Sequence, residues 1–253
     1  AGVDASMLVT EQLGNDENVV SYADKIADKY HFLAERLQIF LQNGFSRKNL
    51  FKVDTADWGR DIANHPAVKD ADVIILNWIN QGALSLDCVE KLCDTGKPII
   101  WNMHDMWECT AICHHAYTCD RFKTECMHCP FLRFPGEHDL ANRVFQKKKK
   151  LLANNTIHVI TVSHWLERLA KESALLKHCP IDTIPNTLSL SDFQMMDKAE
   201  CRKQLGLPLD KRVIIFGAAR VDDPIKGFPM ILDALSYLKA HNLEFTQDLH
   251  LVT

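Results

Sequence analysis

Short apolar runs bounded by turn residues alternate with longer amphipathic stretches along most of this chain. The most compact run, residues 97–103 (KPIIWNM), follows the turn pair Thr95-Gly96 and predicts a central strand of a parallel sheet. Further strands are predicted from similar apolar runs at residues 3–10, 72–78, 157–162 and 181–184. This pattern indicates an α/β fold built on a parallel sheet.

The amphipathic stretches between these runs predict helices. Residues 21–43 have an apolar stripe at helical spacing, which we expect to face the core, made of Ile26, Tyr30, Leu33, Leu37 and Phe40. Residues 45–70 are polar and predict irregular structure. Further helices are predicted after the N-cap residue Ser85, at residues 139–155, and after the N-cap residue Ser163.

The pattern restarts near residue 212. Residues 212–219 predict a strand, residues 220–226 a polar loop, and Gly227 the start of a helix, before a last strand begins at residue 249. We therefore predict a first domain at residues 1–190, a linker with a short helix at 191–211, and the start of a second α/β domain at 212–253.

Composition narrows the class of protein. The chain has 253 residues, of which 47% are hydrophobic, so it is large enough to bury a core of its own. A net charge of −4 gives no general attraction to nucleic acid, and we expect no nucleic-acid partner. Nine cysteines, an odd number, favour a reducing compartment and a cytoplasmic protein. Neither a signal-peptide pattern nor an apolar run of the ~20 residues that a membrane helix needs is present.

Four consecutive lysines, residues 147–150, lie within one of the predicted helices. Such a run can attract phosphate or an anionic lipid surface. Charged runs on helices usually face water, however, so we expect a solvated helix face here.

Cysteines are concentrated in the loop at residues 104–130. Cys126 and Cys129 form a C-x-x-C pair, and Cys113 and Cys119 can supply the other half of four soft ligands of the kind that zinc prefers. His114, His115 and His128 are spare donors, so the ligand set is not unique. A structural zinc would close a loop that lacks its own core. A disulfide, a redox C-x-x-C and buried free thiols remain alternatives.

Two further places are candidate ligand sites. His104-Asp105 follows the central strand, and ligands bind outside the carboxyl ends of strands in open α/β sheets. A histidine that only makes local hydrogen bonds is the alternative. Arg220 and Lys226 lie in the loop before the last predicted helix, where free backbone N–H groups favour phosphate. Two surface bases on a loop would explain the same residues without a ligand.

Several of these stretches, in this order, resemble the retaining glycosyltransferases of family 4, most closely the subgroup that makes bacterial cell-surface polysaccharides. The resemblance covers nearly the whole chain, and each motif is weak alone. The stretches are Asp72-Val73-Ile74-Ile75, Gly96-Lys97-Pro98, His104-Asp105-Met106-Trp107, the cysteine loop ending Cys129-Pro130, Ser163-His164-Trp165-Leu166, Ile184-Pro185-Asn186 and residues 216–228.

The resemblance implies two Rossmann-like domains facing a cleft, the GT-B architecture. A nucleotide-sugar donor would bind mainly to the second domain and a glycan or lipid-linked acceptor to the first, with the enzyme peripheral at the inner membrane. His104 would lie at the reaction centre, and the donor site would include Asn186, where the chain crosses between domains, together with Gly217, Arg220 and Lys226. No catalytic metal is implied, and any zinc in the cysteine loop would be structural.

The chain also departs from the family's pattern. The family's first strand and Gly-rich acceptor loop would precede Ala1, and its E-x7-E region would follow Thr253, so we expect a fragment without activity of its own. Asn186-Thr187 replaces the usual Asn-Gly pair, and Ala111-Ile112 stands where glycines are common. A metal-binding interaction module without catalysis and a GT-B-type sugar-nucleotide epimerase are the alternative functions.

Overall fold

The structure is a computed structural model that describes residues 2–22 and 25–253. The chain forms two compact units, Ala1–Asn186 and Thr187–Thr253. The first unit thus ends inside the predicted first domain of residues 1–190. Among the described residues, no helix combines the length and the apolar character that crossing a bilayer requires.

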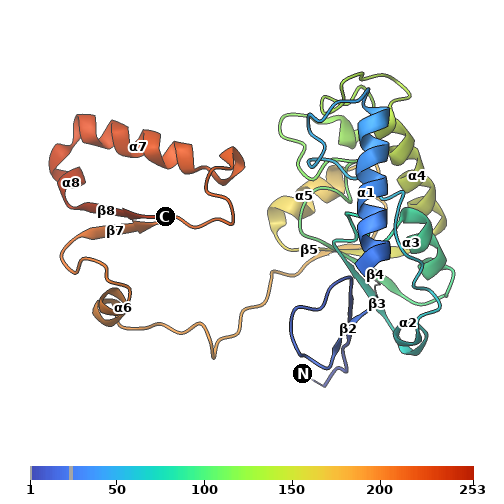
Figure 1. Ribbon diagram of the computed structural model, residues 1–253, viewed down its shortest axis with the longest axis horizontal. Coiled ribbons are helices and arrows are strands. Elements are labelled where there is room, and N and C mark those ends of the chain that lie inside the picture. Colours follow the sequence, from blue (N-terminus) through green and yellow to red (C-terminus); the bar gives the residue numbers. More distant parts are fainter. Residues whose placement is uncertain (1, 23–24) are drawn as a thin grey trace. The chain divides into compact units, whose positions relative to one another are not determined.

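The first unit is built on a four-stranded parallel sheet in the order β3-β4-β5-β6 (Figure 1). Its strands are β3 (Ile74–Asn77), β4 (Ile99–Met103), β5 (Ile157–Thr161) and β6 (Ile181–Thr183). The helices that connect them are α3 (Leu86–Cys93), α4 (Leu140–Asn154) and α5 (His164–Glu172). The predicted α/β fold with a Rossmann-like parallel sheet is confirmed.

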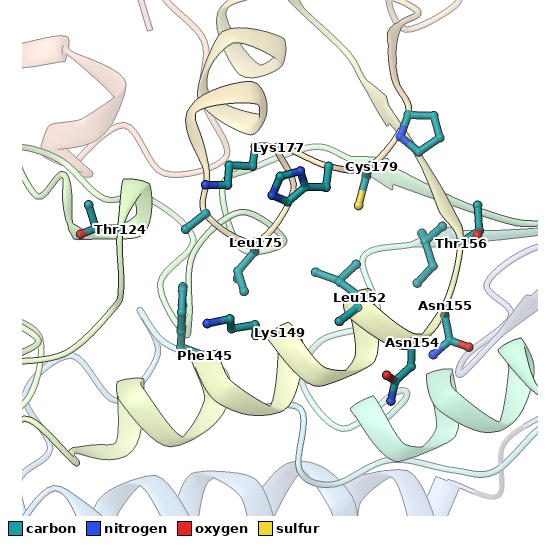
Figure 2. A pocket seen from close by; sticks show the side chains of 15 residues that line it. Thr124, Phe145, Lys149, Leu152, Asn154, Asn155, Thr156, Leu175, Lys177 and Cys179 are labelled. Atoms are coloured by element: carbon teal, nitrogen blue, oxygen red, sulfur yellow. The ribbon is translucent and has the colours of Figure 1, made fainter.

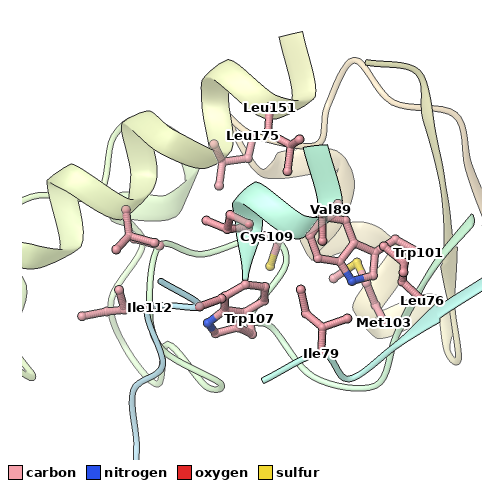
Figure 3. Packing of buried hydrophobic residues seen from close by; sticks show 14 of the residues in the cluster. Leu76, Ile79, Val89, Trp101, Met103, Trp107, Cys109, Ile112, Leu151 and Leu175 are labelled. Carbon is pink, nitrogen blue, oxygen red and sulfur yellow. The ribbon is translucent and has the colours of Figure 1, made fainter. Parts of the chain in front are cut away.

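One face of this sheet carries the hydrophobic core. Leu76, Trp101 and Val159 are register partners on neighbouring strands and are all buried. Val89 of α3 and Leu151 of α4 belong to the same buried cluster (Figure 3). The other face is more open and carries polar side chains at the strand ends.

The three connecting helices begin at side-chain caps. Ser85 accepts a hydrogen bond of 3.1 Å from the backbone N–H of Cys88, and Asp139 accepts one of 2.9 Å from that of Asn142. Ser163 accepts one from Leu166 in the same way. Each cap satisfies a backbone donor that a helix leaves unpaired at its start, which confirms the predicted caps at Ser85 and Ser163.

The N-terminal segment differs from its prediction. Only Met7–Val9 (β1) is a strand, and it pairs with Val19–Ser21 (β2) in a separate two-stranded sheet. The helix α1 (Lys25–Gln42) buries Glu35, Arg36 and Ile39. The segment predicted as irregular contains a short helix, α2 (Pro66–Asp70).

The expected core stripe of α1 is therefore wrong. Its members Ile26, Tyr30, Leu33 and Leu37 are exposed, Ile26 to 80%. The opposite side of the helix packs inward because Glu35 and Arg36 find ionic and backbone partners in residues 53–56. The side of the helix that is buried is thus decided by polar partners that are remote in the sequence.

The second unit contains a β-α-β arrangement. β7 (Arg212–Ile215) pairs in parallel with β8 (Leu249–Val252), and α7 (Phe228–His241) and α8 (Leu243–Gln247) lie between them in the sequence. A short helix, α6 (Lys198–Gln204), precedes β7, and the 3₁₀ turn η2 (Pro224–Lys226) precedes α7. The strand predicted at 212–219 is confirmed only to Ile215, after which a loop begins.

Candidate active site

The carboxyl ends of β3 and β4 form an edge lined by two amides and an imidazole. Asn77 accepts a hydrogen bond of 2.9 Å through Oδ1 from Nδ2 of Asn102, its cross-strand partner. The same Nδ2 lies 3.2 Å from Nε2 of the exposed His104. Because an amide nitrogen only donates, Nε2 of His104 is the acceptor in this contact. β4 lies between β3 and β5, so His104 occupies the centre of the edge at which such sheets bind ligands.

The turn after β3 is strained and carries an unpaired amide. Trp78 and Gln81 have φ values of 40° and 57°, a left-handed backbone that non-glycine residues rarely adopt. Both side-chain polar atoms of Asn80 are buried, and neither has a hydrogen-bond partner among the described residues. Oδ1 of Asn102 is also buried and also has no hydrogen-bond partner among the described residues. Strain and unpaired polar atoms gather at functional sites, so this edge is a candidate for ligand binding.

His114, from the cysteine-rich loop, joins this edge to the interior. Its Nδ1 lies 2.8 Å from Oδ2 of Asp105, and its Nε2 lies 2.5 Å from Oδ2 of Asp54. Burial by itself would lower the pKa of the imidazole, but the hydrogen bonds to the two carboxylates outweigh it and raise the pKa to about 9. His114 is therefore an imidazolium at neutral pH, donating from both nitrogens and holding Asp105 beside His104.

The ion pairs of His114 are part of a longer ionic chain that continues from Asp54 to Arg36 and Glu35. Arg36 pairs with Oδ1 of Asp54 and lies 3.0 Å from Oε2 of Glu35. Oε1 of Glu35 accepts from the backbone N–H groups of Thr55 and Ala56, each at 2.8 Å. Burial, with Asp54 nearby, raises the pKa of Glu35. This network fixes the loop that carries Asp54 and therefore fixes the position of His114.

Two more buried ionisable side chains, Lys148 and Glu108, belong to or contact the segment that follows His104. Nζ of Lys148 donates to the carbonyls of Trp107 and Thr110 at 2.6 and 3.1 Å, and lies 3.1 Å from the Trp107 ring centroid. Burial lowers the pKa of Lys148 to about 7. Burial and the charge of Asp105 raise the pKa of Glu108 to about 8. The segment after His104 is thus anchored from α4 by one lysine.

The expectation that residues 147–150 form a solvated face is wrong for half of the run. Lys148 is 1% exposed. Lys147 is half-buried and reaches Asp57 and Asp87 at 3.3 and 3.0 Å. Only Lys149 and Lys150 are exposed. Four consecutive helical residues span more than one full turn, so at least one of them must point inward when one side of the helix is buried.

The four predicted zinc ligands line one small cavity. Cys113, Cys119, Cys126 and Cys129 surround a space of about 20 Å³, and all are free thiols. Burial raises the pKa of Cys126 and of Cys129 to about 12. Within the described part of the chain, no cluster of three or more His, Cys, Asp or Glu side chains is positioned to hold a metal ion. The zinc site therefore stays a prediction.

The residues predicted to bind the nucleotide-sugar donor lie in the second unit, apart from Asn186. Asn186 is exposed and is the last residue of the first unit. Gly217, Arg220 and Lys226 all lie in the loop between β7 and α7. The guanidinium of Arg220 is 75% exposed and lies 3.0 Å from Asp222. Phe216 and Phe228 bracket this loop, with ring centroids 5.1 Å apart. Gly227, with φ of 81°, caps α7 without a side-chain hydrogen bond, so the start of the helix faces the loop with its backbone.

Sequence reasoning placed His104 but missed the residues that support it. Asp54 and Arg36 contact the site from 60 or more residues upstream of His114, so no local spacing connects them. Glu108 gave one weak signal, because this carboxylate directly follows the apolar pair Met106-Trp107, with which it is buried. No family model matches this chain, and no curated protein matches it either.

Proposed function

We propose that this protein is a retaining glycosyltransferase that moves a sugar from a nucleotide-sugar donor to a glycan or lipid-linked acceptor in polysaccharide synthesis. The observation that carries the proposal is the accessible imidazole of His104 at the centre of the carboxyl edge of a parallel sheet, beside the amides of Asn77 and Asn102. Sugar hydroxyls are recognised by such uncharged donors and acceptors. The ordered motifs shared with family 4 supply the reaction class.

In this proposal His104 acts on the donor sugar. The bond between the anomeric carbon and the diphosphate breaks, its electron pair leaves with the diphosphate, and the acceptor hydroxyl oxygen bonds to the carbon as its proton passes to the leaving diphosphate. His104 is proposed to contact the sugar more strongly in the transition state than in the bound substrate, and a contact of that kind raises the rate. His114 holds Asp105 in place and does not itself react, since both of its nitrogens already donate to carboxylates.

Arg220 and Lys226 are proposed to hold the diphosphate. Two cations offset the negative charge that grows on the leaving group. Arg220 is engaged with Asp222 at 3.0 Å, so the diphosphate competes with that carboxylate for the guanidinium. The backbone at the start of α7 adds the positive end of a helix dipole to the same loop.

The remaining parts of the proposal concern cofactor and compartment. No catalytic metal takes part, and a zinc ion held by the four cysteines would close the loop that follows His104. Nine free thiols suit a reducing compartment, so we place the activity in the cytoplasm, with the protein peripheral at the membrane that carries its acceptor.

Nucleoside-diphosphate binding tests the proposal. Calorimetric titration of the intact protein with a panel of nucleoside diphosphates should find one that binds, and Arg220→Ala and Lys226→Ala should each weaken it about ten- to hundredfold, the effect of losing one charge-assisted contact. Lys211→Ala, which removes an exposed charge outside the loop, is the matched control. Binding to none of the panel, or equal effects of all three variants, would remove this loop from the donor site. Incubation with the nucleotide sugar alone separates an epimerase, which would alter the sugar without an acceptor.

A further inference from the structure

A cavity lies at the opposite edge of the sheet from His104. Its volume is about 570 Å³, and it is enclosed by the end of α4, the start of β5 and the segment 174–180 that leads into β6 (Figure 2). β5 runs from Ile157 to Thr161, so its two ends are separated by roughly 13 Å at 3.3 Å per residue. The cavity is therefore distinct from the edge that carries His104, and its size falls within the range of small-molecule sites.

Cationic side chains, without acidic ones, stand around this cavity. Figure 2 shows Lys149 on α4 and Lys177 on the facing segment, with their amines turned to the same side. His178 also lines the space. None of the fifteen lining residues, all of them in the described part of the chain, is an aspartate or a glutamate. Within that same part, neither Lys149 nor Lys177 forms an ion pair, whereas other lysines of the chain do.

The floor of the cavity is apolar. Phe145 and Leu175 are buried there, and the half-buried Leu152 lines the same space (Figure 2). The end of α4 would repel an anion through its free carbonyls, but Nδ2 of Asn155 already donates to the carbonyl of Leu151 at 2.9 Å. That hydrogen bond reduces the negative potential at the mouth.

We propose that this cavity binds the phosphate group of an amphipathic ligand. Lys149, Lys177 and His178 hold the phosphate oxygens at the rim, and the apolar part of the ligand lies on Phe145, Leu152 and Leu175. The two lysines carry like charges and have no acidic partner among the lining residues, so an anion held between them offsets those charges. The ligand is either a free phosphorylated molecule with an apolar chain or the headgroup of an anionic lipid. This site is independent of the proposed glycosyltransferase activity.

Octyl phosphate is the probe for the shared chemistry. In calorimetry at low ionic strength, it should bind at one site per chain and about tenfold or more tightly than inorganic phosphate, because only its chain reaches the apolar floor. Lys149→Ala and Lys177→Ala should each weaken it about three- to tenfold. Lys150→Ala is the matched control: it removes the same charge from the next position of the same helix, is exposed, and does not line the cavity. The affinity of Lys150→Ala for octyl phosphate should stay within twofold of that of the unsubstituted protein.

Vesicles distinguish the two sources of the phosphate. Flotation with phosphatidylcholine vesicles containing phosphatidic acid, compared with phosphatidylcholine alone, should recover the protein if the ligand is a lipid headgroup, and Lys149→Ala should release it while Lys150→Ala does not. Octyl phosphate binding without vesicle binding supports a free ligand. Failure of octyl phosphate to bind, or equal losses for Lys149→Ala and Lys150→Ala, would overturn the site, because the second result describes a diffuse charged surface.

Discussion

The imidazolium of His114 gives the folded protein a specific dependence on pH. In the unfolded chain an imidazole loses its proton near pH 6.5, whereas in the folded protein His114 keeps its proton to about pH 9. Between these values the folded state holds one more proton, so the free energy of unfolding falls as the pH rises. The contribution is complete below about pH 6.5 and lost above about pH 9.

The size of this effect follows from the two pKa values. One pH unit corresponds to about 1.4 kcal/mol, so a rise from 6.5 to about 9 sets an upper limit of about 3 kcal/mol. The side chain of His114 is 22% exposed and its partners Asp54 and Asp105 are 1% and 28% exposed, so solvent screening removes only part of that value. We expect a loss of about 2–3 kcal/mol between pH 6 and pH 9.

Urea unfolding at several pH values between 6 and 9 measures this loss of unfolding free energy. The same titration on His114→Gln should show a shallower slope, with the variant about 2–3 kcal/mol less stable than the unsubstituted protein at pH 6 and nearer to it at pH 9. His138→Gln, at an exposed histidine, is the matched control and should retain the full slope. If His114→Gln and the unsubstituted protein follow parallel curves across this range, the ionic chain from Asp105 to Asp54 does not hold an imidazolium.

Two other predictions follow from the packing. The four cysteines that line one cavity should bind one zinc ion per chain; native mass spectrometry before and after a chelator measures it, and an unchanged mass with four titratable thiols in the folded protein would refute the site. Gly59→Ala should cost about 2 kcal/mol or more of unfolding free energy in urea, because an added Cβ would collide with the backbone of Leu84 and Ser85. Gly136→Ala, where a Cβ meets nothing within 4 Å, should stay within about 0.5 kcal/mol; similar values for both would contradict the packing described.

The strands of the first unit could be predicted because their local signals agree. The run around Ile99 and Trp101 is apolar, short and bounded by Gly96, and it becomes a central strand with neighbours on both sides. The caps at Ser85 and Ser163 are equally local, since the hydrogen bond they make spans three residues. His104 could be placed at the strand end for the same reason.

What surrounds His104 could not be predicted, because it depends on contacts between distant segments. An apolar stripe on α1 shows that the helix has two different sides, but the buried side was chosen by Arg36 meeting Asp54, 18 residues on. Lys148 is hidden in a run of four identical residues, and only the position of Trp107 shows which of them turns inward. Composition and periodicity predict that charged residues are exposed, and this prediction fails where such residues have buried partners.

The rate and affinity of His104→Ala test the central claim most directly. With the donor and acceptor identified, the intact protein should lose about a hundredfold or more in turnover while its affinity for the donor stays within about threefold, because His104 is assigned a contact made in the transition state and away from the nucleotide. His138→Ala, at an exposed histidine outside the strand edge, should leave both values unchanged. Unaltered turnover in His104→Ala, or equal losses of turnover and affinity, would contradict the role of His104 at the reaction centre.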